Sequence, residues 1–96
     1  MLARAQKTLM LKGSIDFESA VDVLAQGLQL IEQHAYLVFD FSQVVYANSA
    51  ILPVLLAWQR RALSCNKKIQ FVHLPVSVIA LVRLSRIEKI LGLSGR

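Results

Sequence analysis

Three short β-type segments alternate with three helix-type segments along the chain. The β-type segments are the apolar-rich runs Thr8–Lys12, Tyr36–Asp40 and Ile69–Val72, which are typical of strands. Gly13 is expected to stop the first strand, and Asp40 is expected to end the second. Because the second run is almost continuously apolar, we expect a strand buried on both faces, as in a parallel sheet.

A helix is predicted between the first two strands. Its apolar residues recur at steps of three and four, the pattern of one buried stripe; they are Val21, Leu24, Leu28 and Ile31. Ser14 or Asp16 is expected to cap this helix. Gly27 lies in its middle, where glycine costs about 1 kcal/mol relative to alanine, so we expect it to allow close packing against a neighbour.

A second helix is predicted from about Ser49 to about Ser64. Asn48 and Ser49 are good N-cap residues, and Pro53 is tolerated only in a first helical turn. The apolar face of this helix is wider than that of an ordinary amphipathic helix. Trp58 therefore has two interpretations: a core residue, or an anchor for a protein partner.

The order of these elements predicts the fold class. A third helix is predicted over residues 76–84 and a short closing element over 87–91. Strands that alternate with helices imply right-handed parallel crossovers and a layered α/β domain. Since the 96 residues contain no internal repeat and no linker, we expect a single domain over residues 1–96.

Composition narrows the class of protein. Apolar residues make up 55% of the chain and charged residues 18%, which excludes a disordered protein. The longest uninterrupted apolar run, Ala50–Trp58, contains Pro53 and falls short of the roughly 20 residues of a membrane-spanning helix. The first residues lack the apolar core of a signal peptide. We expect a soluble, cytoplasmic protein, and the apolar excess indicates a partner that covers part of it.

Charge is unevenly distributed. Residues 1–48 hold three basic and five acidic side chains, a net charge of −2, whereas residues 49–96 hold eight basic and one acidic, a net charge of +7. Such a basic half suits nucleic acid, an anionic membrane surface or an acidic protein. Because the basic residues lack interleaved aromatics and any nucleic-acid motif, solvated faces and an acidic protein partner are favoured over nucleic acid.

Signs of catalysis and metal binding are missing from the sequence. It contains no nucleotide-binding, metalloprotease or nucleophile-elbow motif. Cys65, His34 and His73 show no ligand-type spacing. Asp40 is the best placed candidate, because open α/β sheets bind ligands beyond the carboxyl ends of their strands, but no base, nucleophile or ligand set accompanies it. We expect no catalytic residue, no metal and no cofactor.

The stretch from Asp40 to Leu52 is the most informative. A buried strand is expected to end at Asp40, and a helix is expected to begin at Ser49 after a short loop. Ser49 has two interpretations: an N-cap that satisfies a free backbone N–H, or a phosphorylation site whose charge would meet the positive end of a helix.

Three motifs together resemble the STAS domain family. They are Gly13-x-Ile15-Asp16, the run Phe39-Asp40-Phe41-Ser42-Gln43-Val44, and Asn48-Ser49-Ala50-x-Leu52 at the start of a helix. The resemblance covers residues 8–91 and is closest to small stand-alone STAS subunits similar to MlaB. It implies a central, mostly parallel sheet of about four strands with helices packed around it.

The resemblance also implies a function. MlaB-like subunits are non-catalytic accessory proteins that bind the cytoplasmic ATPase of an ABC system, which transports phospholipids to maintain outer-membrane asymmetry. They lie at the inner face of the inner membrane through this partner. The alternative within the family is an anti-sigma factor antagonist that a serine kinase switches by phosphorylating Ser49.

Site residues carry over by position. Asp40 and Ser42 match the aspartate and serine of the central motif, and Ser49 matches the residue that is phosphorylated in antagonists and contacts the ATPase in MlaB-like subunits. The predicted partner-binding residues are Asp16, Asn48, Ser49, Ala50 and Ile51.

Two positions depart from the family pattern. Asn48 replaces the usual aspartate, and Ile51 stands where glycine is usual. An isoleucine beside Ser49 is expected to narrow access for a kinase and to favour apolar docking. Both departures favour constitutive binding over phosphorylation.

Overall fold

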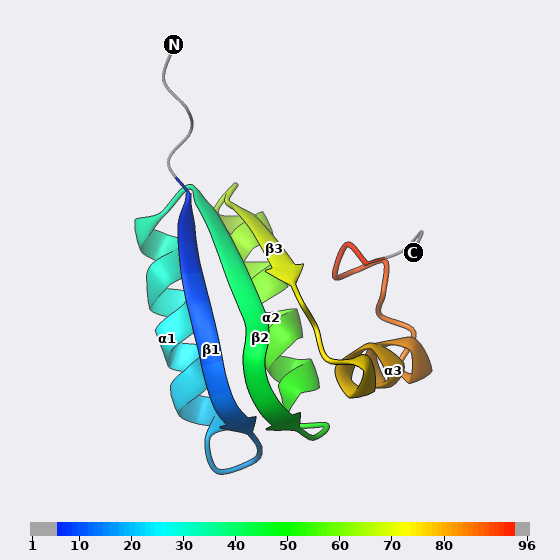
Figure 1. Ribbon diagram of the computed structural model, residues 1–96. Coiled ribbons are helices and arrows are strands. Elements are labelled where there is room, and N and C mark those ends of the chain that lie inside the picture. The colour runs from blue at the N-terminus through cyan, green and yellow to red at the C-terminus, as the bar shows by residue number, and fades with distance from the viewer. Residues whose placement is uncertain (1–5, 94–96) are drawn as a thin grey trace.

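A computed structural model describes residues 6–93 of the chain. Strands and helices alternate along it, as Figure 1 shows. In chain order they are β1 (Lys7–Ile15), α1 (Ala20–Gln33), β2 (Tyr36–Ala47), α2 (Ile51–Ser64), β3 (Lys68–Val72) and α3 (Val76–Leu84). The predicted alternation is confirmed, and α3 has the predicted bounds.

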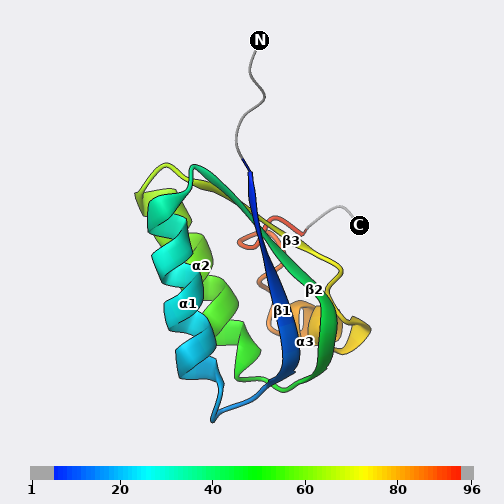
Figure 2. The ribbon, with the colours of Figure 1, turned by 60° about the vertical axis from the view of Figure 1, so that its left-hand side comes forward.

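The three strands form one parallel sheet in the order β1-β2-β3. Leu9 lies opposite Phe39, and Phe39 lies opposite Phe71. Helices α1 and α2 cover one face of this sheet (Figure 2), and α3 lies to the side and packs against α2. The α/β class is confirmed, with three strands in the described part of the chain where about four were expected.

Two predicted strand ends are wrong. Strand β1 does not stop at Gly13 but continues to Ile15, with Gly13 at a φ of +74°. Its pairing with β2 shifts register on either side of Lys12 and Gly13. Because β1 continues, β2 keeps a hydrogen-bonding partner as far as Ala47. Asp40 therefore lies within β2 and not at its end.

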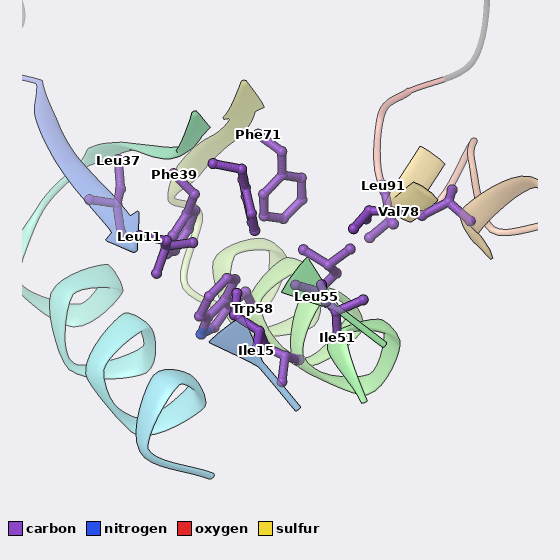
Figure 3. Packing of buried hydrophobic residues seen from close by; sticks show 14 of the residues in the cluster. Leu11, Ile15, Leu37, Phe39, Ile51, Leu55, Trp58, Phe71, Val78 and Leu91 are labelled. Atoms are coloured by element: carbon purple, nitrogen blue, oxygen red, sulfur yellow. The ribbon is translucent and has the colours of Figure 1, made fainter. Parts of the chain in front are cut away.

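Trp58 is a core residue. Its side chain is fully buried and stacks on Phe39, with ring centroids 4.1 Å apart and planes 8° apart (Figure 3). Its Nε1–H donates a hydrogen bond to the Leu24 carbonyl at 3.1 Å. The core interpretation is confirmed, and the alternative of a partner anchor is wrong.

The α1 stripe is buried only in part. Ile31 is fully buried, but Val21 is 71% exposed, so the prediction of one buried stripe is wrong at its first position. Gly27 is buried against α2, which confirms the prediction of close packing: a Cβ atom at this position would lie 2.3 Å from Trp58. The covered part of α1 is therefore its middle and end.

Candidate functional site

The carboxyl ends of β1 and β2 bring two loops together at one end of the molecule (Figure 1, lower end). We call residues 16–19 and 48–50 the tip. Ile15 and Ala47 are paired at the ends of their strands, and the backbone N–H of Asn48 donates to the Ile15 carbonyl at 3.2 Å. Parallel pairing therefore places Asp16 and Asn48 on the same edge of the sheet.

Asp16 organises the first loop. Its Oδ1 accepts hydrogen bonds from the backbone N–H groups of Glu18 and Ser19, both at 3.0 Å. The hydrogen bond from Ser19 contributes most to a pKa below the ordinary value for this carboxyl. The Ser19 Oγ also donates to the Ser14 carbonyl at 3.0 Å. Asp16 thus holds the turn that leads into α1, which begins four residues later at Ala20.

Asn48 organises the second loop. Its Oδ1 accepts a hydrogen bond from the Ala50 N–H at 2.9 Å, and its carbonyl accepts one from the Ile51 N–H at 3.1 Å. Helix α2 begins at Ile51, two residues later than predicted. In the described chain the side chain that accepts a backbone N–H here belongs to Asn48, so the interpretation of Ser49 as a side-chain cap is wrong. Ser49 is exposed.

The predicted partner-binding residues divide into surface and interior positions. Asp16 and Asn48 are half-buried and Ser49 is exposed. Ala50 is 3% exposed and Ile51 has no exposed surface. The Ile51 side chain lies in the core near Leu55 (Figure 3). Because the first turn of α2 directs Ile51 inward, its expected role in apolar docking and in narrowing access to Ser49 is wrong.

The exposed apolar surface of the tip comes from residues that the sequence did not single out. Phe17 and Val21 are each 71% exposed. They border a shallow apolar groove of about 260 Å³ between the first turns of α1 and α2, which is lined by Phe17, Ala20, Val21, Leu24, Ala50, Pro53 and Val54. The sequence did not mark these two residues as exposed, because Phe17 lies in a turn and Val21 fits the apolar stripe of the helix. Their spacing of four residues was the one sequence feature that could have indicated a shared surface.

Acidic residues are neighbours in the sequence of two groove residues. Glu18 and Asp22 are exposed and flank Phe17 and Val21 in the chain. Asp16 adds a third carboxylate at the same loop. Acidic groups near the start of a helix interact favourably with its positive end. The segment that supplies Phe17 and Val21 to the apolar groove thus also carries negative charge, which suits a partner surface with apolar and basic side chains.

Asp40 and Ser42 lie away from the tip. Asp40 pairs with Met10 on β1 and with Val72 on β3. Its Oδ1 accepts the Ser42 N–H at 2.9 Å and lies 3.1 Å from His73 Nδ1. The Ser42 hydrogen bond and, after it, His73 hold the pKa of Asp40 below its ordinary value. The carboxylate thus links β2 to the segment after β3, a contact over 33 residues that no local pattern signals.

Neither a metal-binding cluster nor a membrane-spanning helix is found in residues 6–93. Residues 6–93 contain no cluster of three or more His, Cys, Asp or Glu side chains arranged to hold a metal ion. In the same part of the chain, none of the helices has the length and apolar character needed to cross a membrane.

Comparisons with known proteins agree with this fold. A family model described as "Mlab, STAS domain" matches residues 2–93. The structure of the anti-sigma factor antagonist SpoIIAA in its unphosphorylated form matches with a TM-score of 0.67 and 14% identity, covering 88% of this chain and 78% of that chain. The phosphorylated form of the Bacillus cell fate determinant SpoIIAA matches with a TM-score of 0.69 and 16% identity, covering 96% and 81%. No curated protein matches the sequence.

Proposed function

The chain belongs to the MlaB-like STAS domain family, and from this membership we propose that it is a non-catalytic accessory subunit of a phospholipid-transport ABC system. Its partner in this proposal is the cytoplasmic ATPase, and it lies at the inner face of the inner membrane through that partner. STAS domains act through protein–protein interaction, so the proposal assigns a binding role to this chain and leaves the chemistry to the ATPase.

One observation carries the proposal: the apolar groove at the tip opens beside Ser49, the position where the family contacts its ATPase. Phe17 and Val21 keep most of their surface exposed, which is unfavourable for large apolar side chains unless a partner covers them. Full burial of such a side chain contributes roughly 1.5–3 kcal/mol. Two of them on one groove therefore make it a favourable point of contact within a larger interface.

Binding at the tip would act on the partner through linkage. A subunit that binds only the folded ATPase stabilises it by a free energy that grows with the logarithm of the subunit concentration divided by the dissociation constant. The tip is suited to this role because its loops are fixed by Asp16 and Asn48 in the free chain. Because the loops are already ordered, binding loses little conformational entropy, and this favours affinity.

The second candidate is an anti-sigma factor antagonist that is switched at Ser49. It is favoured by the exposure of Ser49 two residues before α2, and by the similarity to SpoIIAA, whose structure is known in unphosphorylated and phosphorylated forms. A phosphate on Ser49 would meet the positive end of α2. It would also place a dianion next to Ala50 of the groove, where it would oppose the docking of an apolar partner surface.

A pull-down from the native cell distinguishes the two candidates. Tagged wild-type chain and Ser49→Arg would be compared by mass spectrometry of the captured proteins. Capture of an ABC ATPase and its permease, lost in Ser49→Arg, supports the accessory subunit and a contact at the tip. Capture of a serine kinase or an anti-sigma factor in place of the ATPase overturns it in favour of the switch. Leu63→Arg, at an exposed leucine near the opposite end of α2, is the control for an added surface charge.

A further inference from the structure

The outward face of α3 is apolar and is left uncovered by the described part of the chain. Val76 and Leu84 are 84% and 81% exposed. Ala80, also exposed, lies between them at four-residue steps, so the three side chains share one face. The inward face holds Val78 and Val82, which are buried in the core. Neighbouring exposed apolar side chains of this kind often mark an interaction site, so the outward face is a candidate for contact with another surface.

Basic residues accompany this face. Arg83 is seven residues from Val76 and therefore lies on the same side of the helix. Arg86 and Lys89 follow in the segment after the end of α3, and all three are exposed. Glu88 is the only acidic residue from α3 to the end of the described chain, and it is half-buried. The occupant is therefore expected to carry negative charge.

We propose that the outward face of α3 rests on an anionic lipid bilayer. We call this surface the α3 face; it consists of Val76, Ala80, Arg83 and Leu84, with Arg86 at its end. Aliphatic side chains would enter the region between head groups and acyl chains, and the guanidinium groups would bind the lipid phosphates. Apolar contact and attraction between basic side chains and lipid phosphates both contribute to the binding of a helix to an anionic membrane.

The charge of the chain favours a bilayer over a second copy of itself. The net charge of +5 makes two copies repel one another, whereas the same charge is attracted to an anionic membrane. The α3 face also lacks the aromatic residues that dominate the centres of protein interfaces. Aliphatic residues beside arginine suffice for a lipid surface, which adapts to the shape of the helix.

The α3 face and the tip groove are separate surfaces. The groove lies between α1 and α2, whereas α3 lies on the other side of α2 in Figure 1. The lipid proposal therefore does not depend on the partner proposed for the tip. A variant of Phe17 is expected to bind vesicles like the wild type, which makes failure of one proposal distinguishable from failure of the other.

Vesicle co-sedimentation tests the proposal with the full chain. The probes are vesicles of phosphatidylcholine alone and vesicles of phosphatidylcholine and phosphatidylglycerol in equal parts. We expect binding only to the anionic vesicles, and binding that weakens as salt screens the surface charge. Reversal of one charge in Arg83→Glu is expected to lower the binding constant about tenfold or more. Leu84→Ser is expected to lower it several-fold through lost apolar contact.

Matched variants elsewhere on the chain control for charge and hydrophobicity. Arg60→Glu reverses an exposed arginine on α2, and Leu63→Ser removes an exposed leucine from the same helix; both are expected to bind vesicles like the wild type. Because the α3 positions are exposed, their variants should remain folded, which circular dichroism checks. Absence of binding to anionic vesicles, or equal losses in the α2 controls, overturns the proposal. Binding to soluble polyglutamate without binding to vesicles also overturns it, in favour of an acidic protein partner.

Discussion

Gly27 of α1 lies directly against the indole ring of Trp58 of α2. A Cβ atom at position 27 would lie 2.3 Å from both Cε2 and Nε1 of the ring. The same ring stacks on Phe39 of the central strand. The indole is therefore held between α1 and the sheet, and the missing side chain at Gly27 sets how closely the two helices approach. This contact positions the first turns of α1 and α2 on either side of the groove.

Gly27→Ala is expected to destabilise the fold. Alanine gains about 1 kcal/mol in helix propensity over glycine, but overpacking a tight core typically costs about 1–3 kcal/mol and sometimes more. The ring has little room to move because Phe39 stacks on its other face, so we expect the clash to outweigh the propensity gain. The midpoint of urea unfolding should fall. Gln26→Ala, at an exposed position on the same helix, controls for propensity, and an increased midpoint for Gly27→Ala would contradict the packing account.

Trp58→Ala is expected to lower the free energy of unfolding by about 3–5 kcal/mol, the usual cost of truncating a buried aromatic residue. The loss includes the stacking on Phe39 and the hydrogen bond to the Leu24 carbonyl. For a chain of this size such a loss takes most of the available stability. Thermal unfolding followed by circular dichroism measures it. A folded Trp58→Ala protein with near wild-type stability would mean that the indole is not a core residue in solution.

The sequence predicted the helix that contains Trp58 but not the role of this residue. Hydrophobic periodicity predicted α2 and its wide apolar face, because that face reflects contacts with both the sheet and α1. It could not decide between core and partner anchor for Trp58. The decision depends on Phe39 and Gly27, which lie 19 and 31 residues away in the sequence and meet the indole only after the crossovers form.

Strand ends were less predictable than strand centres for a physical reason. Glycine commonly ends a strand, yet β1 continues through Gly13, which has a positive φ and lies where the pairing of β1 with β2 shifts register. Once β1 continues, the stretch after Asp40 pairs with it and becomes strand. The same extension moved Asp40 away from the tip and left Asn48 at the edge. Asp16 and Asn48, two of the residues predicted to bind a partner, lie together at the tip, whereas Ile51, another of them, is buried.

Phe17→Ser should weaken partner binding without changing stability. Phe17 is 71% exposed, and substitutions at exposed positions usually change stability by less than about 0.5 kcal/mol. Loss of a large apolar anchor from the groove should lower affinity for the captured partner by about tenfold or more. Isothermal calorimetry with the purified partner measures the change, and Leu63→Ser is the matched control. Equal affinity in Phe17→Ser and wild type would exclude the groove as the contact surface.

The stability of the chain should fall in acid partly through Asp40. Hydrogen bonds from Ser42 and His73 lower its pKa in the folded state below the ordinary value of 3.8. A lowered folded-state pKa contributes stability that is complete above the unfolded value and is lost as pH falls through the folded value. Asp40→Asn removes this contribution, so its urea midpoint should fall less steeply than that of the wild type below pH 3.8. Identical acid profiles for the two proteins would contradict the assignment.

Asn48 and Ser49 are adjacent, yet we expect a loss of stability only from replacing Asn48 with alanine. Asn48 Oδ1 accepts the Ala50 N–H at the start of α2, and loss of such a capping bond costs about 1 kcal/mol. Ser49 is exposed and the Ala50 cap of α2 makes no side-chain bond, so Ser49→Ala should leave the free energy of unfolding within about 0.5 kcal/mol of the wild type. Urea unfolding of both variants provides the comparison.

The predicted order of stabilities separates the two roles at the tip: Asn48 holds the loop, which leaves the Ser49 hydroxyl available to a partner or a kinase. If Ser49→Ala were the more destabilising variant, Ser49 would be a structural cap and the argument for its role in binding would lose its basis.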